Sequence, residues 1–84
     1  MRLDKYLKVT RLIKRRTVAN EACDGARVSV NGKQAKASYD VKLGDEITVT
    51  FVEKAVTVRV LDIKDTTKKS EATGMYEIIS ESGE

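Results

Sequence analysis

The sequence predicts a small α+β domain in which two short packed helices precede an antiparallel β-sheet and a short C-terminal helical tail. Over residues 3–24 the apolar residues recur with helical spacing, and over residues 27–60 they alternate with polar residues as in half-buried strands. The chain has 84 residues, which is enough for one hydrophobic core. We therefore expect one domain over residues 1–63 and an extension over residues 64–84, partly helical and frayed at its end.

The first helix should begin near Arg2 and end near Thr10. A rotation of about 100° per residue places two kinds of side chain on opposite sides of this helix. The inner side carries Leu3, Tyr6, Leu7 and Thr10, and the outer side carries Asp4, Lys5, Lys8 and Arg11. Leu12 would fall on the charged side, so the helix should stop before it. For Tyr6 the helical phase favours packing in the core over stacking on a base.

A second helix is predicted over residues 17–24. Thr17 can serve as its N-cap, and Gly25 stands where a left-handed residue is wanted after the last turn. One arc of this helix carries Val18, Ala19, Ala22 and Cys23. These side chains are small enough for close packing against the first helix, and Cys23 is interpreted as a small buried hydrophobe.

The next segment reads as strands joined by tight turns. Residues 27–30 alternate and run into Asn31-Gly32, the strongest short signal for a hairpin. Gly44-Asp45 should form the turn that leads into two further strands, with Ile47, Val49 and Phe51 inward in one and Val56, Val58 and Val60 inward in the other. A turn at Glu53-Lys54 separates these two strands, and the core should close near Ile63.

The extension gives a weaker pattern. Asp65-Thr66-Thr67 could cap a short helix that holds Ala72, Met75 and Tyr76, although Gly74 inside it costs about 1 kcal/mol relative to Ala. The last five residues contain no apolar anchor, so we expect them to be frayed.

Positive charge is concentrated at the start of the chain. The first 16 residues carry seven basic side chains against Asp4 alone, whereas residues 45–84 carry nine acidic and five basic ones. The basic side chains are Arg2, Lys5, Lys8, Arg11, Lys14, Arg15 and Arg16. Because this asymmetry would orient the molecule in the field of a polyanion, it predicts a nucleic-acid partner.

The composition argues against several other classes of protein. The sequence has no His and one Cys, so it offers neither an ordinary Cys/His metal site nor a Ser-His-Asp or Cys-His catalytic arrangement. We therefore expect no metal, no cofactor and no enzymatic activity. No apolar run approaches the ~18–20 residues of a membrane-spanning helix, and the N-terminus lacks the apolar segment of a secretory signal. The expected location is the cytoplasm, without membrane contact.

Four blocks of sequence, in this order and at this spacing, resemble the S-four (S4) RNA-binding domain, also called the alpha-L motif. The blocks are Arg2-Leu3-Asp4-Lys5-Tyr6-Leu7, Ile13-Lys14-Arg15-Arg16-Thr17, Gly25-Ala26-Arg27-Val28-Ser29-Val30-Asn31-Gly32-Lys33 and Lys42-Leu43-Gly44-Asp45. The resemblance covers residues 1–62. A chain of this size is most similar to the heat-shock-protein-fifteen-like group. Within that group, the segments 65–69 and 75–76 and the acidic end resemble the RqcP-like branch.

The resemblance implies a role on the ribosome. Members of that branch bind large subunits obstructed by peptidyl-tRNA and work with RqcH, which delivers alanyl-tRNA for alanine tailing of the stalled chain. The expected partners are therefore large-subunit rRNA, peptidyl-tRNA and an RqcH-type factor, with a monomer off the ribosome. Two alternatives stay open: a heat-shock-protein-fifteen-like factor that recycles free large subunits carrying nascent chains, and a basic protein-binding module. An enzyme subunit is disfavoured, because the enzymes that carry this domain need a second domain.

The candidate RNA-binding residues follow from the charge pattern and the resemblance together. Guanidinium groups can bind phosphate through two hydrogen bonds or stack on bases, so Arg16 is the first candidate. The full set is Arg16, Arg15 and Lys14 at the helix junction, Arg2, Lys5, Lys8 and Arg11 on the first helix, Lys33 and Lys36 after the hairpin turn, and Asp4. Asp4 could orient a neighbouring Arg or accept a bond from a ribose 2′-hydroxyl, but capping of the helix N-terminus is an equally good interpretation.

Overall fold

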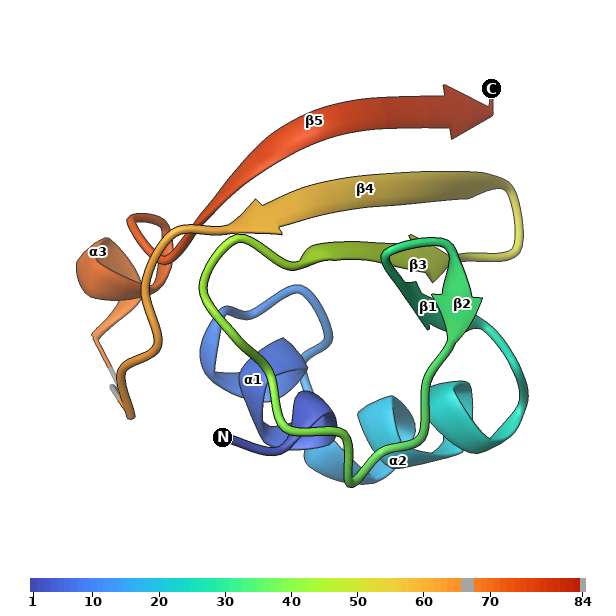
Figure 1. Cartoon of the computed structure of the whole chain (residues 1–84), viewed down its shortest axis with the longest axis horizontal. Coiled ribbons are helices and arrows are strands. Elements are labelled where there is room, and N and C mark those ends of the chain that lie inside the picture. Colours follow the sequence, from blue (N-terminus) through green and yellow to red (C-terminus); the bar gives the residue numbers. More distant parts are fainter. Residues whose placement is uncertain (66–67, 84) are drawn as a thin grey trace.

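A computed structural model describes residues 1–65 and 68–83 of the chain. The described elements are α1 (Leu3–Val9), α2 (Arg16–Asp24), β1 (Val28–Val30), β2 (Lys33–Gln34), β3 (Glu46–Thr50), β4 (Lys54–Val60), α3 (Lys69–Ala72) and β5 (Tyr76–Gly83). The strands form one sheet in the order β2-β1-β3-β4-β5, and every neighbouring pair is antiparallel. Helices α1 and α2 pack below this sheet, and β5 lies at its outer edge (Figure 1). The α+β class predicted from the sequence is confirmed.

The inner side of α1 is buried as its spacing predicts, with Leu3, Tyr6, Leu7 and Thr10 all in the core. Its outer side differs from the prediction at two positions. Asp4 is buried, because α2 packs over the first turn of α1. Arg11 lies beyond the end of the helix with a φ of 64°, so the left-handed backbone there, rather than a change of side-chain pattern, ends α1.

Helix α2 begins one residue earlier than predicted, at Arg16, so the assignment of Thr17 as the N-cap is wrong. Arg15 holds the N-cap position in an extended conformation, and within the described chain its side chain makes no capping hydrogen bond. Ala19, Ala22 and Cys23 are buried as expected, but Val18 is exposed because it lies at the edge of the packed arc. Burial also raises the pKa of Cys23 to about 11, which fits a structural thiol.

The end of α2 corrects the role assigned to Gly25. Gly25 has a φ of −84°, and the left-handed residue is Ala26, with a φ of 63°. The N–H of Ala26 donates to the carbonyl of Cys23 and the N–H of Arg27 to that of Ala22, at 3.2 and 2.9 Å. These two bonds define a Schellman motif whose left-handed position is occupied by a residue with a Cβ atom.

We expect Ala26→Gly to stabilise the protein by about 0.5–1 kcal/mol. A left-handed conformation costs a non-glycine residue roughly 1–2 kcal/mol, and the added freedom of glycine in the unfolded chain offsets part of the gain. Chemical denaturation at equilibrium measures this difference. Gly25→Ala is the matched control and should be neutral or destabilising, because a Cβ there would lie 3.1 Å from the carbonyl oxygen of Glu21. A loss of stability in Ala26→Gly would contradict the assignment.

The predicted hairpin is confirmed: Ser29 pairs with Gln34 and Val30 with Lys33 across a turn in which Asn31 and Gly32 both have positive φ. The chain then crosses the start of α1 before entering β3. There the N–H of Leu3 donates to Tyr39 and the N–H of Asp4 to Ala37, at 2.8 and 3.2 Å. The first turn of α1 is therefore held by backbone hydrogen bonds from a distant segment.

A buried carboxylate fixes the turn before β3. Asp45 accepts hydrogen bonds from the Tyr39 hydroxyl at 2.8 Å, the Lys42 N–H at 2.9 Å and the Asn31 side-chain amide at 3.1 Å. Burial opposes its charge, but these donors and the charge of Lys42 outweigh the burial and hold the pKa of Asp45 below its ordinary value. The Gly44-Asp45 turn is thus confirmed, and it is tied to the hairpin through Asn31.

The C-terminal extension differs most from the prediction. Residues 76–83 form β5, which pairs with all of β4, so the expectation of a frayed end at residues 80–83 is wrong. Val58 pairs with Ile78 and Thr57 with Ser80, which makes Ile79 the extra residue of a β-bulge. The bulge breaks the alternation of apolar residues by which a strand is recognised in sequence.

The predicted helix in the extension is reduced to α3, which covers Lys69–Ala72 and starts after Lys68. The cap was expected at Asp65-Thr66-Thr67; Lys68 holds the N-cap position instead of Asp65, and Thr66 and Thr67 lie outside the described residues. Ala72 and Met75 are buried, and the Tyr6 hydroxyl donates to the Met75 carbonyl at 2.8 Å. The core therefore continues past Ile63 into the extension.

The β3–β4 connection also corrects the sequence assignment. Phe51, expected inward in the strand, follows the end of β3 and is 37% exposed. Strand β3 keeps only Ile47 and Val49 in the core.

Candidate nucleic-acid interface

The buried carboxylate of Asp4 connects the first turns of α1 and α2. Its two oxygens receive the Lys5 N–H at 2.8 Å, the Arg2 Nε at 3.2 Å and the Asn20 amide at 3.3 Å. The Arg16 Nε lies 3.4 Å from the same carboxylate. Asp4 therefore binds one arginine that precedes α1 and another that begins α2.

The environment of Asp4 keeps it ionised. Burial by itself would raise its pKa, but the hydrogen bonds from Asn20, Arg2, the Lys5 N–H and Arg16 outweigh burial and leave the pKa below its ordinary value. At neutral pH the carboxylate is negative and its donors are held in fixed directions. A buried charge without partners is costly, so the two arginines stabilise the ionised form of Asp4. Asp4 in turn fixes the orientation of the two arginines.

Arg2 and Arg16 each contact Asp4 with part of the guanidinium group, and each side chain is about half exposed. Their side chains are 51% and 48% exposed, although each Nε faces Asp4. The Arg2 Nη2 also lies 3.5 Å from the second Asp4 oxygen, but a guanidinium group has five N–H donors, so Asp4 uses only some of the donors of each arginine. Two arginines held by one carboxylate can bind neighbouring phosphate oxygens, or one can stack on a base while the other binds a phosphate.

A row of lysines extends this pair along α1. Lys5 and Lys8 lie three residues apart and therefore on the same face of the helix, in line with Arg2. The Lys5 Nζ is paired with the Asp65 carboxylate at 2.8 Å, and the hydrogen bond from Lys5, the charge of Lys5 and the charge of Lys8 lower the pKa of Asp65. A phosphate at Lys5 would either compete with Asp65 or use the ammonium donors that Asp65 does not bind.

The junction before α2 adds Lys14 and Arg15, both exposed. Arg15, the N-cap residue of α2, makes no side-chain capping hydrogen bond to the first turn of that helix, whose N–H groups have no partner within the helix itself. Backbone N–H groups at a helix N-terminus favour an anion such as phosphate. The site thus combines arginine side chains with the partially positive N-terminal end of α2, and both favour an anion.

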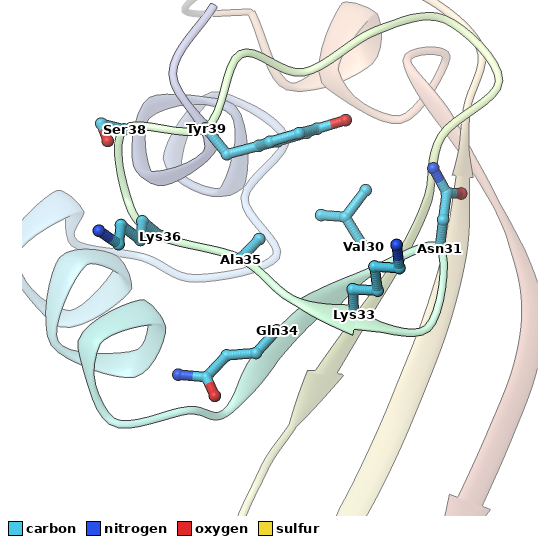
Figure 2. Close-up of a pocket in the computed structure, with 8 residues that line it drawn as sticks. All are labelled: Val30, Asn31, Lys33, Gln34, Ala35, Lys36, Ser38 and Tyr39. Carbon is cyan, nitrogen blue, oxygen red and sulfur yellow. The ribbon is translucent and has the colours of Figure 1, made fainter.

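The two lysines after the hairpin lie at different ends of their segment. Figure 2 shows Lys36 directed toward the helices and Lys33 beside Asn31, at the turn. The structure therefore brings Lys36 to the side of the helix pair and leaves Lys33 apart from it. Arg11, in the left-handed turn after α1, no longer follows the helical row of Lys5 and Lys8.

The outer part of the sheet has a different charge pattern. Arg59 on β4 is paired with Glu77 at 2.9 Å and with Glu46 at 3.5 Å, so its charge is offset by two carboxylates. We give the name basic face to the six basic residues that lie on the two helices or directly before them: Arg2, Lys5, Lys8, Lys14, Arg15 and Arg16. Arg59 and its two carboxylates lie on the sheet instead.

Two residues of this candidate interface, Asn20 and Asp65, are not among those predicted from the sequence. Asn20 lies four residues after Arg16, on the same side of α2, and this helical spacing could have revealed it. Asp65 contacts Lys5 across 60 residues of sequence, and nothing local signals that contact.

Comparison with known proteins places the chain in a family. A model of the S4 domain matches residues 1–47, which is more than half of the chain. The chain belongs to the S4 domain family. The matched region of this S4-domain protein contains α1, α2, the hairpin and the whole basic face.

Individual relatives of the S4-domain protein extend beyond that region. It is 65% identical over 81 residues to the RQC P-site tRNA stabilizing factor of Bacillus subtilis, covering 96% of this chain and 94% of that protein. It is 36% identical to heat shock protein 15 of Escherichia coli, covering all of this chain and 64% of that protein. The trimeric structure of Vibrio cholerae heat shock protein 15 superimposes with a TM-score of 0.87 at 32% identity, covering 95% of this chain and 82% of that one.

Among the described residues, no helix is long and apolar enough to span a membrane.

Proposed function

We propose that this S4-domain protein binds RNA through the basic face and stabilises peptidyl-tRNA on an obstructed large ribosomal subunit during ribosome-associated quality control. The observation that carries the proposal is the buried Asp4, which holds Arg2 and Arg16 side by side with their outer donors exposed. A surface that served only solubility would not require a buried carboxylate to organise it. The similarity to RQC P-site tRNA stabilizing factors supports the choice of RNA.

The proposed role is structural and involves no chemical step by the protein itself. The basic face contacts large-subunit rRNA and the tRNA backbone, with Arg16 and Arg2 as the central contacts and Lys5, Lys8, Lys14 and Arg15 around them. Arg11, Lys33 and Lys36 make outer contacts, and Asp4 orients the arginines. By holding the tRNA in place, the protein supports alanine tailing of the stalled chain by an RqcH-type factor. When it is not on the ribosome, the protein is a monomer in the cytoplasm.

Salt-dependent binding to defined subunits tests this proposal. Large subunits are purified with peptidyl-tRNA retained, and a matched sample is treated with puromycin to release the nascent chain. We expect the protein to sediment preferentially with the obstructed sample. If the protein neutralises about five phosphates, the logarithm of the association constant K should fall with log[salt] at a slope of about −3.5 to −4.5.

Two outcomes would point elsewhere. Preferential binding to the obstructed sample that leaves alanine tailing by an RqcH-type factor unchanged would favour the recycling role of heat-shock-protein-fifteen-like factors. A complex that survives complete nuclease digestion, with affinity indifferent to salt, would indicate a basic protein-binding module instead.

A further inference from the structure

An apolar groove lies between the α1–α2 junction, helix α2 and the β3–β4 turn. Its apolar lining comes from Leu12, Ile13, Val18, Ala22, Phe51 and Val52. Lys14 and Arg27 line it as well, and the Lys54 Nζ lies 6.0 Å from the centroid of the Phe51 ring. The lining is therefore mostly apolar, and its charged members, Lys14 and Arg27, are both basic; together with Lys54 we call them the positive rim.

Folding does not account for the residues at the end of this groove. Val52 is 99% exposed at the tip of the β3–β4 turn, and Val18 is 47% exposed on α2. A tight turn normally carries Gly, Asn, Asp or Ser, which supply either positive φ or local hydrogen bonds. An apolar Phe-Val pair at this place, next to an exposed Val on a helix, is typical of a surface that is covered by a partner.

Helix α2 separates most of this groove from the Asp4-centred part of the basic face, and Lys14 at the helix junction borders both surfaces. Arg16 and Asn20 contact Asp4, whereas Val18 and Ala22 line the groove. Residues two apart on a helix are rotated by about 200°, so the two pairs lie on nearly opposite sides of α2. An RNA bound at Arg2 and Arg16 would therefore leave the Val18 side of the groove accessible.

The chemistry of the groove favours a protein over RNA as its occupant. Most of its lining is aliphatic, which suits Leu, Ile or Val side chains, whereas a nucleotide brings a charged phosphate and a polar sugar. One face of Phe51, the aromatic ring in the groove, is approached by Lys54, which reduces its use for base stacking. The positive rim is complementary to carboxylates.

We propose that the groove binds a segment of a partner protein in which apolar side chains are flanked by Asp or Glu. The protein then bridges RNA on one side of α2 and a protein on the other, a bridging role that rests on the proposed function. The docked segment would cover Val18 and Val52 and place its carboxylates against Arg27 and Lys54.

Site-specific photo-crosslinking in cells tests the bridge with the full chain. A benzophenone amino acid replaces Val52 in one strain and Lys8 in another, and cross-linked material is identified by mass spectrometry. We expect the probe at position 52 to label an acidic, apolar segment of a protein, and the probe at position 8 to label RNA. RNA at position 52, or no cross-link there, would overturn the proposal.

The identified segment is then synthesised and titrated into the purified, isotope-labelled protein. We expect chemical-shift changes at Val18 and Val52, and at least a tenfold loss of affinity in Val52→Lys and in Arg27→Glu. Leu43→Lys is the matched control, since Leu43 is also an exposed apolar turn residue but lies outside the groove. Unchanged affinity in Val52→Lys would also overturn the proposal.

The two proposals fail in different ways. If position 8 does not label RNA while position 52 labels a protein segment that binds in solution, the proposed RNA-binding function fails and the docking site stands. If position 8 labels RNA and position 52 labels no protein, only the docking site is rejected.

Discussion

Replacing Arg16 by Gln should weaken binding to obstructed large subunits by roughly 10- to 100-fold, because a charge-assisted contact to phosphate contributes about 1.5–3 kcal/mol. The slope of log K against log[salt] should also become less steep by about 1, since one phosphate contact is lost. The fold should survive, because Asp4 retains Arg2, Asn20 and the Lys5 N–H as donors. Sedimentation at several salt concentrations, with circular dichroism to verify folding, measures the effect.

Arg59→Gln is the matched control for Arg16→Gln. Both substitutions remove one positive charge from an arginine of similar exposure, 44% for Arg59 and 48% for Arg16. If overall charge decided binding, the two variants would lose affinity equally, and the basic face would be rejected as the interface. Asp4→Asn adds the converse test: it makes the protein more positive, yet binding should weaken because the arginines lose their common partner.

Replacing Asp45 by Ala should lower the free energy of unfolding by about 2–4 kcal/mol. The substitution leaves the Tyr39 hydroxyl, the Lys42 N–H and the Asn31 amide without their acceptor, and losing hydrogen bonds to a buried charge has this order of cost. In a domain of this size, each kcal/mol lowers the melting temperature by about 4–8 °C. Thermal unfolding followed by circular dichroism measures the loss.

The lowered pKa of Asp45 leads us to expect that the free energy of unfolding depends on pH. The pKa of Asp45 lies below its ordinary value of 3.8 in the folded protein, and so does that of Asp4. The unfolded chain therefore takes up protons first, and the stability that these groups contribute is present above pH 3.8 and lost as pH falls through the folded pKa values. In Asp45→Ala, the free energy of unfolding should therefore fall less steeply as the pH is lowered through this range.

Asp40→Ala serves as the control, because Asp40 is an exposed carboxylate in the same connection, paired with the N-terminal amine and Lys42. It should melt close to the unsubstituted protein. A similar melting temperature for Asp45→Ala would show that the buried network does not hold the turn.

Local signals predicted the elements whose interactions are close in sequence. The buried side of α1 followed from the spacing of Leu3, Tyr6 and Leu7, and the hairpin followed from Asn31-Gly32. In both cases the chemistry lies within a few residues: a helical repeat in one, positive φ at two turn residues in the other. The candidate site was predicted to the same extent, because the charges of α1 and the helix junction are contiguous in the chain.

Exact helix ends were harder to predict, because backbone geometry can override residue preference. Gly25 was the natural left-handed residue, yet Ala26 takes that conformation, since the two bonds to the Ala22 and Cys23 carbonyls fix it there. Thr17 was the natural cap, yet the helix begins at Arg16, whose side chain is held by Asp4.

The sequence by itself determined the α+β class, the helix pair, the hairpin and the concentration of positive charge at the N-terminal end. Only the tertiary structure decided that Asp4 is buried between Arg2 and Arg16, that Asp65 pairs with Lys5, and that residues 76–83 complete the sheet. The physical reason is the range of the interactions. Helical periodicity and turn conformation act between near neighbours, whereas the solvation of a carboxylate and the pairing of an edge strand depend on groups that only folding brings together.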